Sequence, residues 1–218
     1  MYISGITLTN FRNFASMSLD LPSGLVVFHG RNAQGKTSII EAIYLMSIGK
    51  SFRAESEREV VTWQAALRGE PSVIDGVVHS SDMKLRILIG YRPVLSEEVG
   101  MDTLKRGGGG LNVHRRIKVN GVDRTLSGLV GQLNAVVFTA NDLDMVIGPP
   151  AARRRYLDIL ISQVDREYLR ALQRYQRVLQ RRNRIIKSIR EAKSKEDELL
   201  FWDEQLVKEG SLIVRRRI

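Results

Sequence analysis

The sequence predicts an α/β protein in which a lobe of strands and turns precedes a helical lobe. Three observations lead to this fold class. A glycine-rich segment at residues 30–37 stands between an apolar run and a helical pattern, the residues before Pro149 form short apolar or alternating runs, and no glycine occurs between Pro150 and Gly210. We expect the two lobes to span residues 1–149 and 150–218.

The composition is that of a globular protein, because 43% of the 218 residues are hydrophobic and 27% are charged. No apolar run approaches the roughly 18 residues that a membrane span needs, and the first residues lack the order of a signal peptide. We therefore expect a soluble, cytoplasmic protein with no membrane partner. The absence of cysteine excludes disulfides, thiolate zinc sites and a cysteine nucleophile.

The charge is strongly basic and uneven. The net charge is +10, of which +2 belongs to residues 1–149 and +8 to residues 150–218. Such a balance favours a polyanionic partner, and nucleic acid is the most frequent one.

The first lobe contains several apolar or alternating runs that are typical of strands. The pair Asn120-Gly121 follows one of them and predicts a tight hairpin turn. A run of four glycines at 107–110 predicts a flexible loop or a linker. The expected strands are residues 2–9, 17–21, 25–28, 73–79, 85–91, 117–119 and 136–139.

Residues 30–37 match the pattern G-x-x-x-x-G-K-[ST] at every fixed position. The apolar run 25–28 precedes them and a mostly apolar helical pattern over 37–47 follows, which is the arrangement that a phosphate-binding loop requires. We expect the backbone to bind phosphate, Lys36 to add a cation at the β and γ phosphates, and the Thr37 hydroxyl to bind Mg²⁺. The alternative is a chance match in a glycine turn. The expected nucleotide-binding residues are Gly30, Arg31, Asn32, Ala33, Gln34, Gly35, Lys36 and Thr37.

Several motifs resemble those of the RecF family of bacterial recombination mediators. They include Asn-Phe-Arg-Asn-Phe at 10–14, the loop residues 32–37 and Glu-Ala-Ile-Tyr-Leu at 41–45. The resemblance extends over nearly the whole chain. Further matching segments lie at residues 49–53, 138–143, 148–158 and 180–183.

The resemblance implies an ATPase head of the ABC type, related to SMC proteins, with a mixed sheet followed by a helical second lobe. It implies ATP and Mg²⁺ as cofactors and a homodimer that holds ATP between two heads on DNA. It also implies binding to single-stranded and gapped duplex DNA, contact with other mediator proteins, and a role in recombinational repair, replication restart and the SOS response. A full-length protein of this kind would be a weak DNA-dependent ATPase.

Two motifs that complete such an ATPase are not evident. Residues 126–132 imitate the Leu-Ser-x-Gly signature but precede the basic helical region, and in the RecF resemblance they align with an ordinary linker helix. The run 136–139 is not followed by Asp-Glu. We identify no catalytic residue, expect the second lobe to be truncated at its carboxyl end, and expect little or no hydrolysis by this chain alone.

Each of several further residues has more than one interpretation. Arg12 corresponds to an arginine that approaches the phosphates in related heads, or is a solvated arginine at a strand end. Asn32 donates from its amide or simply suits a loop, and Arg53 contacts DNA, a partner head or solvent. Asn141 is a helix cap or, with Asp142, a residue that senses Mg²⁺.

Residues 168–189 predict a helix with one apolar stripe, because apolar side chains recur at spacings of three and four. Five arginines follow the same spacing about 200° away around the helix. Such a row suits a DNA backbone, although an acidic protein surface or plain solvation also fits it. The five are Arg170, Arg174, Arg177, Arg181 and Arg184.

Two other functions use a phosphate loop. A small phosphotransferase would need an acceptor pocket and a catalytic acid, and the sequence offers no obvious one. For a scaffold with a vestigial loop, the substitution Lys36→Ala would leave nucleotide binding unchanged.

Overall fold

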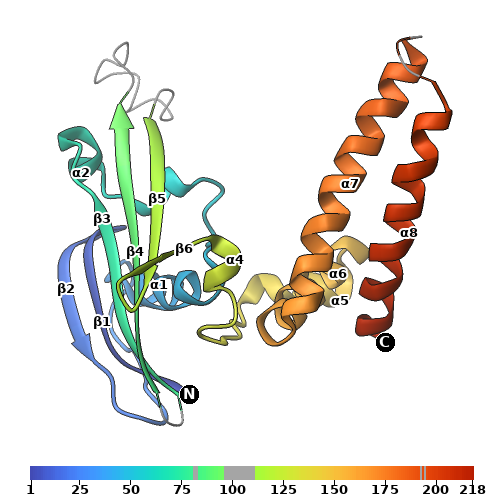
Figure 1. Ribbon diagram of the computed structural model, residues 1–218. Coiled ribbons are helices and arrows are strands. Elements are labelled where there is room, and N and C mark those ends of the chain that lie inside the picture. Colours follow the sequence, from blue (N-terminus) through green and yellow to red (C-terminus); the bar gives the residue numbers. More distant parts are fainter. Residues whose placement is uncertain (81–82, 96–110, 192, 194) are drawn as a thin grey trace. The chain divides into compact units, whose positions relative to one another are not determined.

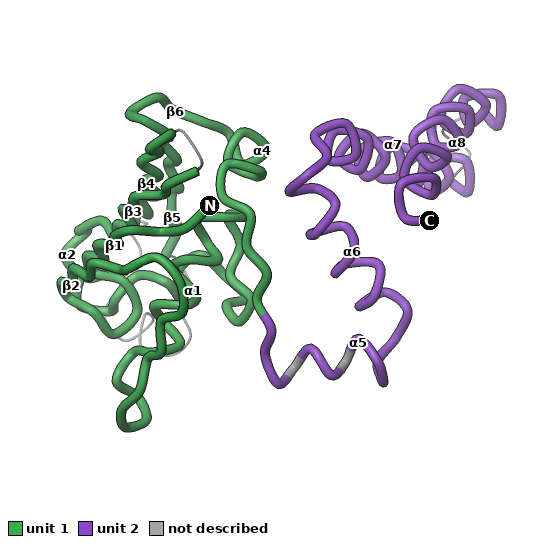
Figure 2. The backbone as a smooth tube through the Cα atoms, turned by 90° about the horizontal axis from the view of Figure 1, so that it is seen from below, with its two compact units in different colours: residues 1–137 green, residues 138–218 purple. Residues whose placement is uncertain are grey.

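The computed structural model describes residues 1–80, 83–95, 111–191, 193 and 195–218 (Figure 1). The glycine run at 107–110 lies outside these residues. Figure 2 shows the chain divided into two compact units, residues 1–137 and 138–218. The division falls earlier than the expected boundary near Pro150, because residues 138–149 form short helices that pack with the second unit.

Unit 1 is built on a six-stranded sheet with the order β2-β1-β3-β4-β5-β6. Each strand pairs antiparallel with its neighbour. The predicted hairpin turn is confirmed, since Asn120 and Gly121 both have positive φ between β5 and β6. The strands are β1 (Tyr2–Phe11), β2 (Phe14–Asp20), β3 (Ser72–Ser80), β4 (Met83–Leu95), β5 (Leu111–Val119) and β6 (Val122–Arg124).

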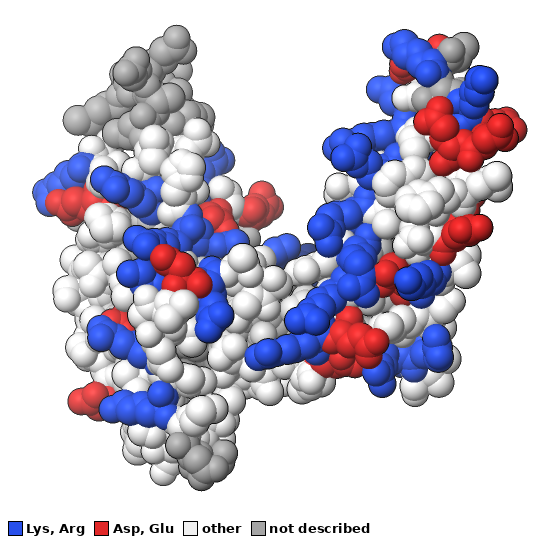
Figure 3. Space-filling view, viewed as in Figure 1, with Lys and Arg blue, Asp and Glu red and all other residues white. Residues whose placement is uncertain are grey.

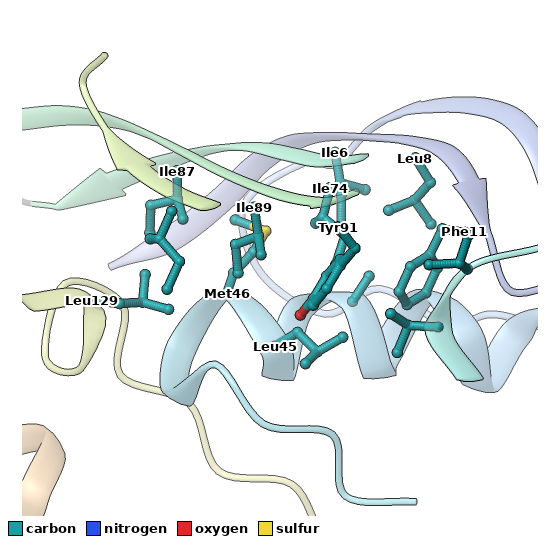
Figure 4. Packing of buried hydrophobic residues seen from close by; sticks show 14 of the residues in the cluster. Ile6, Leu8, Phe11, Leu45, Met46, Ile74, Ile87, Ile89, Tyr91 and Leu129 are labelled. Carbon is teal, nitrogen blue, oxygen red and sulfur yellow. The ribbon is translucent and has the colours of Figure 1, made fainter. Parts of the chain in front are cut away.

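One face of the sheet is covered by α1 (Lys36–Ile48), and the core lies between them (Figure 4). Alternate side chains of the strands point to this face, as the period of two predicts. Leu45 and Met46 extend from α1 toward the sheet and are buried. The sheet side of this core consists chiefly of Ile6, Leu8, Ile74, Ile87, Ile89 and Tyr91.

Shorter elements close the edges of unit 1. They are η1 (Glu57–Val60), α2 (Trp63–Arg68) and α4 (Leu126–Leu129). The segment that imitates a signature motif forms α4, where the Thr125 side chain caps the helix and Leu129 is fully buried in the core. This packing agrees with its interpretation as a linker helix.

Two of the predicted strands are wrong. Residues 25–28 and 136–139 have no strand assignment, and neither pairs with any strand among the described residues. Their apolar side chains alternate between exposed and half-buried and none is buried in a core, with 91% of Leu25 and 74% of Phe138 exposed. The α/β fold class with a helical second part is confirmed, but the described sheet is antiparallel throughout rather than mixed.

Unit 2 is helical and consists of a short entry region followed by three longer helices. The predicted helix over 168–189 is confirmed as part of α7, which packs along α8 (Figure 1). Asp165 caps α7 by accepting hydrogen bonds from the backbone of Glu167 and Tyr168. The elements are η2 (Ala140–Leu143), α5 (Asp144–Ile147), α6 (Pro150–Val164), α7 (Arg166–Arg190) and α8 (Asp197–Arg217).

A polar cluster joins the three long helices of unit 2. The Tyr168 hydroxyl on α7 donates to Asp158 on α6, and Arg217 on α8 donates to Asp158 over 2.7 Å. Burial, together with the hydrogen bond to Asp158, raises the pKa of Tyr168 to about 12. The tyrosine therefore stays a neutral donor at physiological pH. Among the described residues, no helix is both long enough and apolar enough to cross a membrane.

The core assignment predicts that Leu8→Ala lowers the free energy of unfolding of unit 1 by about 2–5 kcal/mol, because the side chain is fully buried. Urea unfolding followed by Trp63 fluorescence measures this change, and a Trp202→Phe background removes the other tryptophan. Leu25→Ala is the matched control and should change stability by less than about 0.5 kcal/mol. Equal effects of the two substitutions would contradict the assigned core.

Candidate nucleotide site

The glycine-rich loop wraps the amino end of α1 as the pattern predicts. Gly30, Ala33 and Gly35 have φ values of 141°, 64° and 94°, which turn the backbone sharply ahead of the helix. Gly35 is the residue that caps α1, and its carbonyl accepts the first helical hydrogen bond from Ile39. The free N–H groups of the first helical turn therefore face the loop, where they favour an anion.

Gly35 has a second reason to be glycine. A Cβ atom at this position would lie 2.3 Å from Cζ of Phe14 and 2.9 Å from Nδ2 of Asn13. The turn between β1 and β2 thus packs directly on the loop. Asn13 also accepts a hydrogen bond from Ser38 over 3.1 Å, which ties this turn to the first turn of α1.

Lys36 lies along the inside of the loop. Its Nζ donates to the carbonyls of Gly30 and Arg31 over 2.8 and 2.6 Å. An open pocket of about 530 Å³ lies beside it. Its lining comprises Arg12, Asn13, Asn32, Ala33, Gln34, Gly35, Lys36, Thr37, Ser38, Arg53, Glu59, Val61 and Trp63.

Thr37 offers the one side chain expected to bind Mg²⁺, and it is exposed beside the pocket. The described residues contain no cluster of three acidic or histidine side chains that could hold a metal. A hydroxyl is a suitable Mg²⁺ ligand when phosphate oxygens and waters supply the rest of its octahedron. The residues present therefore fit an ion bound together with a nucleotide, rather than an all-protein metal cage.

Glu41 forms a charged centre beneath the pocket, on the second turn of α1. Its side chain is completely buried. Arg12 donates to it through Nε and Nη2 over 2.9 and 2.5 Å, and Arg53 donates through Nε over 2.7 Å. The Ser51 hydroxyl adds a fourth hydrogen bond. Both carboxylate oxygens of Glu41 thus accept hydrogen bonds from groups outside α1.

The backbone of Arg12 is unusual, because its φ of 54° lies in the left-handed region that side chains other than glycine rarely adopt. The surrounding contacts hold it there. Its amide N–H donates to the carbonyl oxygen of Val60, and its Nη1 donates to the carbonyl oxygen of Glu59, each over 2.8 Å. Strained backbone of this kind persists only where neighbouring structure fixes it.

Burial acts to raise the pKa of Glu41, but the hydrogen bonds from Arg12 and Ser51 and the charges of both arginines outweigh it. The pKa therefore lies below the ordinary value of 4.5. Glu41 is a carboxylate at neutral pH and forms charge-assisted hydrogen bonds with both arginines.

The structure brings Arg12, Arg53 and loop residues 32–37 together around one pocket, whereas Gly30 and Arg31 are not part of its lining. Arg53, which we expected at DNA, a partner head or solvent, lies beside Ser38 and donates to it over 3.1 Å. Sequence reasoning missed Glu41 and Trp63. Glu41 could have been recognised as a charged residue between the apolar residues of α1, because a buried charge requires a partner. Trp63 gave no such signal, although it is 60% exposed at the pocket.

The arginine face of α7 is only partly free. Arg174 pairs with the buried Glu209 of α8 over 2.7 Å, so one of the five predicted cations has an acidic partner that spacing alone did not reveal. Figure 3 shows basic side chains gathered along α7. Among the described residues, no ion pair involves the four other arginines, which are all exposed: Arg170, Arg177, Arg181 and Arg184.

The side chain of Asn141 lies outside the described residues, so its predicted capping role stays a prediction. Asp142 accepts hydrogen bonds from the backbone and the hydroxyl of Thr139 at the start of η2. This carboxylate thus stabilises the entry to unit 2.

The lowered pKa of Glu41 predicts a pH dependence of stability. As pH falls below about 4.5, the unfolded carboxylate takes up a proton before the folded one does, so the stabilisation contributed by this group is lost. The stability difference between the native chain and Glu41→Gln should be constant above this pH and shrink below it. Urea unfolding between pH 3 and pH 7, in steps of about half a unit, measures the difference. A difference that is independent of pH would contradict the assigned pairing.

A model of an AAA ATPase domain matches residues 1–107. A DNA replication and repair protein RecF of Herpetosiphon aurantiacus is 38% identical over the whole chain, which covers 56% of that protein, and the RecF of Clostridium novyi is 37% identical, with 54% of it covered. The chain spans about half the length of the curated relatives that it matches.

A solved structure described as the recombination mediator protein RecF with ATP, in the RecFOR pathway, is 32% identical to this chain with a TM-score of 0.83. The match covers 99% of this chain and 52% of that one. The resemblance to the RecF family that the sequence motifs indicated is therefore confirmed over the whole chain.

Proposed function

We propose that this chain is the ATP-binding part of a RecF-type protein that acts in DNA replication and repair. The observation that carries the proposal is the pocket in which the phosphate loop faces Arg12 and Arg53. Loop N–H groups, a lysine and two arginines together suit a triphosphate, whose charge is larger than that of any single group in the pocket. The similarity to a structure described as RecF with ATP supports this choice of nucleotide.

ATP binding is the first step of the proposed function. The Nζ of Lys36, which donates to two loop carbonyls, would donate to phosphate oxygens in their place, and the Thr37 hydroxyl would hold Mg²⁺, which supplies positive charge to the phosphates. Trp63 presents an exposed aromatic ring at the edge of the pocket, where a base can stack. ATP then favours association of two heads into a homodimer.

DNA is the second ligand in the proposal. Four exposed arginines of α7 have no acidic partner among the described residues, and such a row suits a phosphate backbone without reading its sequence. They are Arg170, Arg177, Arg181 and Arg184. Binding at junctions of single-stranded and duplex DNA, cooperation with other recombination mediators and a cytoplasmic location follow from the RecF resemblance. In this proposal, ATP binding and DNA binding together serve the repair of gapped DNA and replication restart.

The first experiment measures ATP affinity by calorimetry with Mg²⁺ at neutral pH. Lys36→Ala should weaken binding about 10- to 100-fold, because it removes a charged hydrogen-bond donor from the phosphates. Lys84→Ala, on the exposed sheet face, is the matched control and should leave the affinity unchanged. A Lys36→Ala variant that binds ATP as well as the native chain would make the loop vestigial.

The second experiment measures affinity for a gapped duplex at several salt concentrations. Arg177→Ala with Arg181→Ala should weaken binding and reduce the slope of log affinity against log salt by about 1 to 2, because two phosphate contacts are lost. Arg116→Ala, an exposed arginine paired with Asp123 on the sheet, is the control. An unchanged slope in the α7 variant would exclude this helix from the DNA-binding surface.

A further inference from the structure

Three separate segments meet at the Glu41 carboxylate. Arg12 arrives from the end of β1, Arg53 and Ser51 arrive from the segment after α1, and Glu41 itself lies five residues beyond Lys36 on the loop's own helix. The carboxylate therefore ties the phosphate loop to both arginines. Among the described residues, the groups that donate to the Glu41 carboxylate all come from outside α1.

Neither guanidinium uses all of its N–H groups in these contacts. Arg12 uses Nε and Nη2 for Glu41 and one Nη1 hydrogen for the Glu59 carbonyl. Arg53 directs Nε and Nη2 at Glu41, and its Nη2 also donates to Ser38. A guanidinium carries five N–H groups, so each arginine keeps unused donors. Both arginines line the pocket beside the phosphate loop, where these donors are available to a ligand.

We propose that Glu41 is a positioning residue for the nucleotide, holding Arg12 and Arg53 as a preformed pair that binds the phosphates opposite Lys36. The inference rests on the proposed ATP binding and adds to it the residue that orders the site. It also assigns Arg53 to the nucleotide rather than to DNA.

The charges of the site favour this role over simple burial of an ion pair. One carboxylate faces two arginines, so the trio keeps a net positive charge, and Lys36 adds another beside it. The carboxylate is fully buried while the side chains of Arg12 and Arg53 are 17% and 36% exposed, so the cations lie nearer to the pocket than the anion does. Long arginine side chains lose rotamer freedom when they bind, and prior fixation removes much of that loss.

The test is a double-mutant cycle on ATP affinity, measured by calorimetry with Mg²⁺ at neutral pH. Glu41→Gln should weaken binding about tenfold in the native background, because both arginines lose their fixed positions. The same substitution should change affinity by less than about twofold in a variant that already carries Arg12→Ala and Arg53→Ala. Asp75→Asn removes a carboxylate that pairs with Arg86 on the opposite face of the sheet, and should leave affinity unchanged.

Each outcome decides the proposal. Equal weakening by Glu41→Gln in both backgrounds would mean a structural role alone, and tighter ATP binding by Glu41→Gln would mean that the carboxylate competes with the phosphates for the arginines. Either result overturns the inference while leaving ATP binding in place. A native chain that does not bind ATP overturns both the inference and the proposed function.

Thermal unfolding without nucleotide verifies that Glu41→Gln is folded. If it is not, Ser51→Ala replaces it in the same cycle, since it removes one hydrogen bond from Glu41 and leaves every charge in place. Ser51→Ala should weaken ATP binding about two- to threefold in the native background and have no effect without the two arginines. Equal effects in the two backgrounds would again overturn the inference.

Discussion

The buried carboxylate of Glu41 is the constraint on which the nucleotide site depends. A fully buried charge is tolerated only when it is paired and hydrogen-bonded, and removing one partner from such a pair typically costs about 3–5 kcal/mol. Glu41 meets this requirement with Arg12, Arg53 and Ser51, which come from two segments outside α1. Its burial therefore fixes where those segments lie, and with them the walls of the pocket.

The helix that carries Glu41 connects the nucleotide site to the core of unit 1. Its amino end forms the base of the phosphate loop, its middle holds the carboxylate, and its last turns place Leu45 and Met46 against the sheet (Figure 4). Gly35 adds a second fixed point, because the ring of Phe14 occupies the space of a side chain there. The loop is thus supported by a packed core on one side and by the turn after β1 on the other. Binding sites on rigid elements lose less freedom when a ligand arrives.

Much of this arrangement was predictable from local chemistry. The phosphate loop, the hairpin at Asn120 and Gly121 and the amphipathic α7 each depend on residues that are close in sequence, and local spacing describes them well. Features that depend on distant partners were not predictable in this way. The run 25–28 is apolar enough for a strand, but a strand also needs a neighbour, and no described segment pairs with it. Likewise, helical spacing placed Arg174 among the free arginines because Glu209 lies 35 residues further along the chain.

A crystal structure of the chain with Mg²⁺ and a non-hydrolysable ATP analogue tests the central claim most directly. The account predicts that the phosphates occupy the loop, that guanidinium nitrogens of Arg12 and Arg53 lie within about 3.2 Å of phosphate oxygens, and that both arginines keep their hydrogen bonds to Glu41. Phosphates bound in the loop while both arginines remain out of reach, or arginines that leave Glu41 to reach the phosphates, would contradict it.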